Sequence, residues 1–180
     1  RNVANGLDTE FFRPGNGTPR KPHRLLFVGN TDDPKKGVRY LLEAMTHLPE
    51  KIRLTIVDDG FPCKTFAPDL ARRLGLGGRV TFTGKLSAED LRREYQSAQV
   101  TVVPSLYEGF GLPAAESLAC GTPVVGTTAG ALPEVVGEEG TGILVPPRDA
   151  RALTAGIQQA LEDEGQREKM GKAGRERMVN

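Results

Sequence analysis

Residues 99–116 read QVTVVPSLYEGFGLPAAE. The first five are mostly β-branched and are bounded by Pro104, which predicts a short buried strand. Pro113 suits the first position of a helix, because its missing N–H would have no partner there. Gly109 and Gly111 let the backbone approach a ligand closely, and the free N–H groups of a first helical turn favour an anion. The stretch therefore predicts a strand that leads into a nucleotide-type binding site at a helix start.

Strands and helices alternate through the rest of the chain. Apolar, β-branched runs predict six strands, at residues 24–29, 52–57, 80–83, 100–103, 122–126 and 142–145. Apolar residues at helical spacing lie between them, and two terminal helices are predicted over roughly 149–178. This order predicts an α/β fold with a Rossmann-like, doubly wound parallel sheet of about six strands flanked by helices.

Glycine-containing turns follow the first four predicted strands. Gly29 follows the first, residues 58–60 (Asp-Asp-Gly) the second, Gly84 the third and residues 108–111 the fourth. Ligands of doubly wound sheets bind outside the carboxyl ends of the strands, where the strand order reverses. We therefore expect one large cleft at that edge.

Composition places the chain in an ordinary globular class. It has 180 residues, 38% hydrophobic and 26% charged, enough for one domain with a proper core. The net charge of +1 gives no reason to expect nucleic acid as a partner, and no apolar run approaches the roughly 18 residues of a membrane span. Two cysteines, Cys63 and Cys120, are too few for a disulfide framework, and Cys120 is expected to be a small buried thiol. We expect a cytoplasmic protein.

The two ends of the chain resemble cuts in a longer protein. The sequence starts with Arg rather than Met, and a Gly/Pro-rich run covers residues 14–22. Its last residues stop within a predicted charged helix that has no stop signal. We therefore predict a connector over residues 1–22 and one domain over residues 23–180.

Several motifs, taken together and in order, resemble the C-terminal, donor-binding domain of a family 4 retaining glycosyltransferase of the GT-B fold. The signature of that family is a pair of glutamates with seven residues between them, which Glu108 and Glu116 satisfy around Gly-Phe-Gly. The resemblance covers the chain from about Asn5 onward. The other motifs are Lys36-Gly37, Gly84, residues 119–125 (Ala-Cys-Gly-Thr-Pro-Val-Val), Pro133-Glu134 and residues 142–145.

The resemblance implies a role for each motif. Glu108 would face the hydroxyls of the donor sugar and Glu116 those of the nucleotide ribose, tasks that suit acceptor-only carboxylates. Lys36 would stabilise the charge that develops on the leaving diphosphate, so Glu108 and Lys36 are the catalytic candidates. Backbone N–H groups of Gly109, Phe110, Gly111 and Leu112 would bind the sugar and diphosphate. The remaining donor-binding candidates are Gly29, Asn30, Lys85, Leu86 and Ser105. Of these, the resemblance places Lys85 and Leu86, together with Gly84, at the base of the nucleotide.

Two positions depart from the family pattern. Asn30 stands where the family usually has an arginine on the diphosphate, and Asp58 stands where it usually has glycine. Either Lys35 or Lys36 compensates for the missing cation, or donor binding is weak.

Other side chains are not assigned to the chemistry. The paired acids at 32–33 and 58–59 are not the Asp-x-Asp of metal-dependent glycosyltransferases, so we expect neither a metal nor a cofactor. Tyr107 and Phe110 are expected to pack against the wall of the cleft. His23 and His47 have no metal-ligand partner at useful spacing and are expected at the surface.

The predicted function is donor binding in a retaining glycosyltransferase that transfers a hexose from a UDP- or GDP-sugar to an acceptor hydroxyl. The acceptor, a glycan, lipid or small molecule, would bind to an N-terminal domain outside this chain, so the chain alone should bind donor but turn over little. Peripheral membrane association of the full enzyme stays open. Two alternatives also stay open, a non-hydrolysing sugar-nucleotide epimerase and an inactive nucleotide-binding module.

Two other nucleotide-binding classes do not fit. No Gly-x-Gly-x-x-Gly follows a predicted strand, as a dinucleotide-binding oxidoreductase would need. The glycines at 165 and 171 have five residues between them rather than the four of a phosphate loop, and Ala173 stands where that loop has Ser or Thr.

Overall fold

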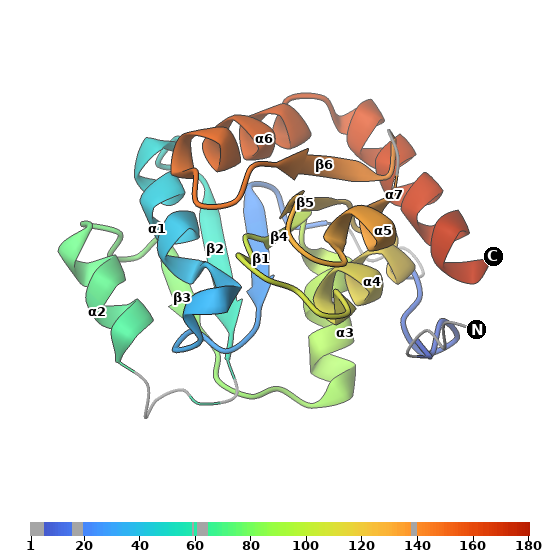
Figure 1. Ribbon diagram of the computed structural model, residues 1–180, viewed down its shortest axis with the longest axis horizontal. Helices are drawn as coiled ribbons and strands as arrows, with labels where there is room; N and C mark the ends of the chain where they lie inside the picture. The colour runs from blue at the N-terminus through green and yellow to red at the C-terminus, as the bar shows by residue number, and fades with distance from the viewer. Residues whose placement is uncertain (1–5, 16–19, 59, 61–64, 138–139) are drawn as a thin grey trace.

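The computed structural model describes residues 6–15, 20–58, 60, 65–137 and 140–180. Parts of the predicted connector (1–5 and 16–19), Asp59 and Cys63 lie outside these residues. Within the described chain, six parallel strands form one sheet in the order β3-β2-β1-β4-β5-β6 (Figure 1). The predicted fold is confirmed. The strands are β1 (Arg24–Val28), β2 (Arg53–Val57), β3 (Val80–Phe82), β4 (Val100–Val103), β5 (Val124–Thr127) and β6 (Gly142–Val145).

Helices cover both faces of the sheet. They are α1 (Val38–His47), α2 (Phe66–Arg73), α3 (Ala88–Ser97), α4 (Leu112–Ala119), α5 (Leu132–Val136), α6 (Ala150–Glu162) and α7 (Glu164–Val179), with a 3-10 turn, η1 (Pro34–Lys36), before α1. Helices α1, α2 and α6 pack together, and α3, α4, α5 and α7 form the other layer. Five residues in α5 and three in η1 are too few to show helical periodicity, so the sequence pattern does not predict them.

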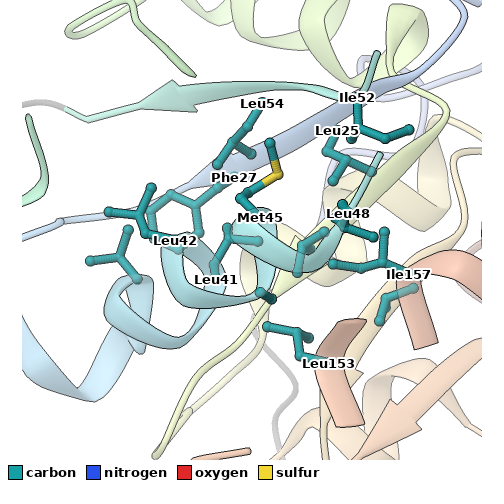
Figure 2. Packing of buried hydrophobic residues seen from close by; sticks show 14 of the residues in the cluster. Leu25, Phe27, Leu41, Leu42, Met45, Leu48, Ile52, Leu54, Leu153 and Ile157 are labelled. Carbon is teal, nitrogen blue, oxygen red and sulfur yellow. The ribbon is translucent and has the colours of Figure 1, made fainter. Parts of the chain in front are cut away.

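The pleat of the strands divides the core between the two faces. Leu25 and Phe27 of β1 belong to the cluster formed with α1, α2 and α6 (Figure 2), whereas Leu26 belongs to a cluster beneath α3. Strand β5 begins two residues later than predicted, because Pro123 has no N–H for the ladder. Full burial of one Leu or Ile contributes about 1.5–3 kcal/mol, so these clusters hold the sheet rigid beneath its edge.

The strand order reverses between β1 and β4. From β1 the chain moves outward through β2 and β3, then returns to β4 on the other side and continues to β5 and β6. Because β1 and β4 are parallel neighbours, the segments that follow Val28 and Val103 leave the sheet side by side. This is the switch point at which ligands of doubly wound sheets bind.

The described part of the predicted connector lies against the domain. Arg20 donates to the carbonyl oxygens of Ala98 and Gly121, at 2.7 and 2.6 Å, beyond the ends of α3 and α4. Arg175 of α7 donates to the carbonyl oxygens of Thr9 and Phe12, at 2.8 and 2.9 Å. The chain just before β1 is therefore held by arginine contacts to backbone carbonyls. Among the described helices, none combines the length and the apolar character that a bilayer span requires.

Candidate functional site

A close backbone approach at the switch point joins two loops. Gly37 has a left-handed conformation (φ +66°), and a Cβ placed on it would lie 1.9 Å from the carbonyl oxygen of Pro104. The N–H of Leu106 also donates to the carbonyl oxygen of Lys35, at 2.6 Å. Only glycine allows this contact, which places Lys36 beside the turn that carries Glu108.

Glu108 and Lys36, the two catalytic candidates, are in direct contact. Glu108 is 7% exposed, and its Oε2 accepts from Lys36 Nζ at 2.9 Å and from Ser105 Oγ at 3.0 Å. Its Oε1 accepts from the N–H of Gly111 at 3.4 Å. The structure thus brings Lys36 to Ser105, Glu108 and Gly111, which lie together in the turn after β4 but far from Lys36 in the sequence.

The loop after β5 supports this turn from behind. Gly130 has φ +57°, and a Cβ there would lie 2.1 Å from the carbonyl oxygen of Glu108. The N–H of Ala131 donates to the same carbonyl at 2.9 Å, and the Thr127 hydroxyl donates to the carbonyl of Ser105. Sequence reasoning missed these supports. The run of small residues at 127–131 (Thr-Thr-Ala-Gly-Ala) is the signal that could have indicated a close approach.

The glycine turn itself lies at the open surface. Gly109 is exposed and has no other heavy atom near the place of its missing Cβ, and Gly111 forms the N-cap of α4 at φ +72°. The prediction that Tyr107 and Phe110 pack against a wall is wrong, because these side chains are 63% and 61% exposed. The ammonium group of Lys35 lies 5.9 Å from the centre of the Tyr107 ring. Two aromatic rings thus stand exposed at the candidate site.

Glu116 has a different partner from Glu108. Its Oε2 accepts a hydrogen bond of 2.8 Å from the hydroxyl of Tyr95, which α3 places against α4. Partial burial raises the pKa of Glu116, and the Tyr95 hydrogen bond opposes this by lowering it. The two glutamates of the signature therefore occupy separate environments.

The loop after β1 is tied to the end of β2. Asp58 is 2% exposed and accepts from the N–H of Thr31 at 2.8 Å, and the Thr31 hydroxyl donates to the same oxygen. Its other oxygen accepts from the N–H of Gly60 at 2.9 Å. Asp58, a departure from the resembled pattern, thus has a structural role here. Asn30 is exposed, and its Oδ1 accepts from the N–H of Asp32 at 2.9 Å.

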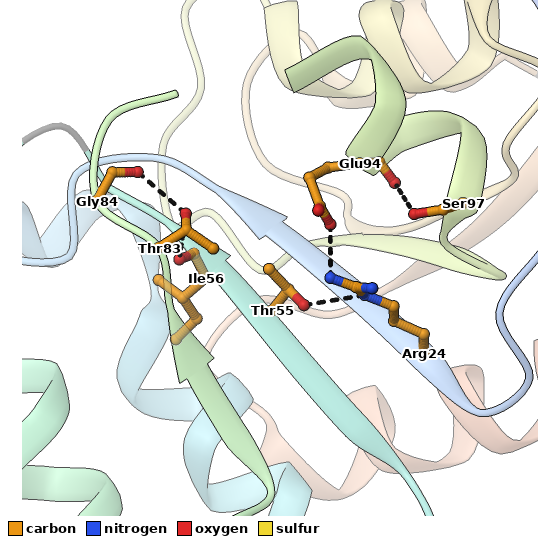
Figure 3. A network of polar contacts seen from close by, with 7 residues as sticks. All are labelled: Arg24, Thr55, Ile56, Thr83, Gly84, Glu94 and Ser97. Carbon is orange, nitrogen blue, oxygen red and sulfur yellow. Dashed lines mark hydrogen bonds and ion pairs between the residues drawn. The ribbon is translucent and has the colours of Figure 1, made fainter. Parts of the chain in front are cut away.

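The predicted base-binding residues follow β3. Gly84 turns the chain at φ +72°, and Lys85 after it is exposed. Leu86 is partly buried and packs against the cluster that contains Tyr95. Within this turn, the Thr83 hydroxyl donates a hydrogen bond to the carbonyl oxygen of Gly84 at 3.0 Å (Figure 3).

A pocket of about 370 Å³ opens beside the site rather than within it. It includes Gly37 and Leu106 from the two joined loops, but none of the predicted donor-binding residues lines it. Its lining consists of Thr31, Asp32, Pro34, Gly37, Val38, Arg39, Tyr40, Phe66 and Leu106. In the described part of the chain, no three His, Cys, Asp or Glu side chains gather in a way that could hold a metal ion.

The buried thiol and the histidines lie as predicted. Cys120 is fully buried, and burial raises its pKa to about 12. His23 is partly exposed, and His47, at the end of α1, is exposed.

Fold and site together define the class of protein. Residues 8–177 match the family described as glycosyl transferases group 1, and the chain belongs to that family. The predicted resemblance is thereby confirmed at the level of the family, and the sheet with its helices is one half of a GT-B fold.

Particular relatives illustrate the match. The chain is 40% identical over 180 residues to the MMP alpha-(1->4)-mannosyltransferase of Mycolicibacterium hassiacum, covering 98% of this chain and 43% of that protein. It superposes on sucrose-phosphate synthase from Thermosynechococcus elongatus with a TM-score of 0.89 and 38% identity, covering 97% of this chain and 46% of the other. The C-terminal domain of a group 1 family protein from Francisella tularensis shares the fold, with a TM-score of 0.81, 22% identity and 97% coverage of both chains. The chain thus spans less than half the length of the first two of these relatives.

Proposed function

We propose that this chain is the donor-binding half of a retaining, family 4 glycosyltransferase that transfers a hexose from a UDP- or GDP-sugar to an acceptor hydroxyl. The observation that carries the proposal is the contact of Lys36, Ser105 and Glu108 at the switch point of the sheet, with the start of α4 beside it. A cation, a carboxylate and free helical N–H groups are what a sugar diphosphate needs in one place.

The charges at the site suit the departure of a diphosphate. Lys36 is 26% exposed, so its ammonium group can reach a ligand while it remains beside Glu108. As the glycosidic bond breaks, negative charge grows on the diphosphate, and a preplaced cation lowers the energy of that state more than that of the ground state. The N–H groups from Gly109 to Leu112 add to this stabilisation. In this proposal the protein supplies the positive charge itself, so neither a metal nor a cofactor is needed.

The two glutamates divide the donor between them. Glu108, beside Lys36, would accept hydroxyls of the sugar, and Glu116, on α4, would accept those of the ribose. Gly29, Asn30, Lys85 and Leu86 would complete the site around the diphosphate and base. The names of the relatives record a mannosyl transfer in one case and sucrose phosphate synthesis in the other, so we leave the sugar open within the hexoses.

The acceptor would bind to the part of the enzyme that faces this domain. Residues 1–22 would connect the two parts. The pocket for the acceptor, a glycan, lipid or small molecule, would lie in the other part and not in this chain. We therefore propose that the chain alone binds donor without appreciable sugar transfer. A buried thiol at Cys120 and the low cysteine count favour a cytoplasmic location for the whole enzyme.

A nucleotide panel tests the proposal. Thermal shift and calorimetry on the 180-residue chain should show binding of UDP or GDP, with or without a sugar, and none of NAD. Lys36→Met should weaken binding roughly ten- to a hundredfold, the value of one charged hydrogen bond. Lys169→Met, on the exposed face of α7, removes the same charge and should leave binding unchanged.

The remaining outcomes separate the alternatives. Conversion of a nucleotide sugar to its epimer without any acceptor would favour an epimerase. Failure of every nucleotide to bind would favour an inactive module. Sugar transfer by the 180-residue chain alone would contradict the assignment of the acceptor site to another part of the enzyme.

A further inference from the structure

The carboxylate of Glu116 is held by a neutral donor. In the described chain, the Tyr95 hydroxyl is the one group that donates a hydrogen bond to it, at 2.8 Å to Oε2. Tyr95 is 0% exposed, so its hydroxyl has no access to water and needs a protein acceptor. The hydrogen bond leaves Oε1 of Glu116 available, and the residue is only partly buried.

Packing fixes the position of the Tyr95 ring. The ring belongs to a cluster with Leu26 and Val57 of the sheet, and Phe12 contacts it edge-on with ring centres 6.1 Å apart. Helix α3 is itself anchored to β1 by the ion pair between Arg24 and Glu94, at 2.7 Å (Figure 3). The Tyr95 hydroxyl is therefore held in one position against α4, and its hydrogen bond holds one oxygen of Glu116 there.

The groups around Glu116 include no direct ion-pair partner among the described residues. Tyr95 faces it from α3, and Cys120 lies at the end of its own helix as a neutral thiol with a pKa near 12. The cations of this region are Arg20, Arg92 and Arg175. They donate hydrogen bonds to backbone carbonyls, and Arg20 also donates to the Thr122 hydroxyl. A neutral donor orients the carboxylate without neutralising its charge, which keeps the second oxygen a strong acceptor.

We propose that Tyr95 is a positioning residue that holds one oxygen of Glu116 and presents the other to the vicinal hydroxyls of a ribose, so that the site selects ribonucleotides over deoxynucleotides. This inference rests on the proposed function. Leu86, the candidate base contact, packs in the same cluster as Tyr95, so the Tyr95 ring links the ribose and base ends of the site.

The position of Tyr95 also gives it an electrostatic effect. Burial raises the pKa of Glu116, and the hydrogen bond from Tyr95 lowers it. Removal of the Tyr95 hydroxyl therefore raises the pKa of Glu116 further. As the pH falls, Glu116 then becomes protonated, and stops being an acceptor-only carboxylate, at a higher pH. Binding of a ribose should then fail at a higher pH than in the unchanged protein.

Tyr95→Phe is the sharpest test, because it keeps the buried ring and removes the hydroxyl alone. The 180-residue chain is titrated calorimetrically with UDP and GDP and with their 2′,3′-dideoxy analogues, across a pH series. We expect the unchanged protein to prefer the ribonucleotide. Tyr95→Phe should weaken ribonucleotide binding roughly three- to tenfold, the value of one hydrogen bond, and leave the dideoxy analogue unaffected. The low-pH limit of ribonucleotide binding should move upward.

A matched variant and a second readout exclude a general packing effect. Tyr40→Phe makes the same chemical change on α1 and should change neither affinity nor its pH limit. Thermal unfolding confirms that each variant is folded. Equal weakening of both nucleotide types by Tyr95→Phe, or no weakening of either, overturns the inference while leaving the proposed function intact. Failure of the unchanged protein to bind any of the nucleotides overturns the proposed function, and this inference with it.

Discussion

Lys36 and Glu108, 72 residues apart in the chain, form an ion pair of 2.9 Å across the switch point of the sheet. The pair exists because Gly37 lets the loop after β1 touch the segment after β4. The Glu108 side chain is 7% exposed and the Lys36 side chain is 26% exposed, so the pair is partly accessible to solvent from the side of Lys36. A bound diphosphate would have to share Lys36 with Glu108.

The ion pair predicts coupling between two substitutions. Lys36→Met leaves Glu108 with a hydroxyl and an N–H as partners and should lower the free energy of unfolding by about 3 kcal/mol, the lower end for a buried pair broken on one side. Glu108→Gln should cost less, because its amide oxygen can still accept from Lys36 and Ser105, and only the weak contact with the Gly111 N–H is lost. The double variant should then be less destabilised than the sum, by roughly 1–2 kcal/mol.

Urea unfolding measures this coupling. Arg93→Met serves as the control, because its pair with Asp90 is largely exposed and should be worth less than about 1 kcal/mol. Strict additivity of the Lys36 and Glu108 substitutions would contradict the pairing.

Gly37→Ala tests the close approach beside Lys36. The new Cβ would lie 1.9 Å from the carbonyl oxygen of Pro104, so the loops must separate and the free energy of unfolding should fall by more than about 2 kcal/mol. Gly75→Ala is the matched control, since Gly75 also has a positive φ (+71°) but nothing near its missing Cβ. It should cost only about 1 kcal/mol of backbone strain. Equal costs would show that the contact with Pro104 does not matter.

Glu116→Gln should make the protein more stable while it weakens nucleotide binding. Because the pKa of Glu116 is raised in the folded state, the folded protein holds its proton more tightly than the unfolded chain does. Ionisation of Glu116 thus lowers stability as the pH rises through the ordinary carboxyl range and above. Gln removes this cost, so the variant should gain stability at pH 7 and lose that gain below the pKa of an ordinary glutamate. A loss of stability at pH 7 would contradict this sign.

Asn30→Arg should tighten binding of UDP or GDP. The position follows β1 at the switch point and is exposed, so an arginine could reach the diphosphate and add a charged hydrogen bond. The gain should be roughly tenfold in Kd by calorimetry. Asn180→Arg adds the same charge at the far end of α7 and controls for net charge. An unchanged Kd would count against the placement of the diphosphate.

The sequence predicts the sheet better than it predicts the site. Short β-branched runs such as residues 100–103 predict all six strands, because buried parallel strands carry a strong and local signal. The contact of Lys36 with Glu108 depends on β1 and β4 being neighbours in the sheet. No local sequence pattern predicts the order of the strands. For Tyr107 and Phe110 the sequence suggested burial that the structure does not have. Their aromatic side chains favour packing, but the residue type alone does not show that the loop holds them away from the core.

Two buried polar residues show where the remaining information lies. In the sequence, Asp58 is only a departure from the glycine that the family usually has there. In the structure it ties the loop after β1 to the end of β2 through hydrogen bonds from Thr31. Tyr95 reads as one apolar position of a helix, and only the packing of α3 on α4 shows what its hydroxyl reaches. Both roles arise from tertiary contacts, of the loop after β1 with the end of β2 and of α3 with α4, which form only once the sheet is assembled.

A structure of the 180-residue chain with UDP or GDP bound would show directly where the diphosphate lies. We expect a diphosphate within hydrogen-bond distance of Lys36 Nζ and of the N–H groups at the start of α4, with a ribose hydroxyl on Glu116. A nucleotide bound instead in the neighbouring 370 Å³ pocket, or elsewhere with the pair of Lys36 and Glu108 untouched, would contradict it.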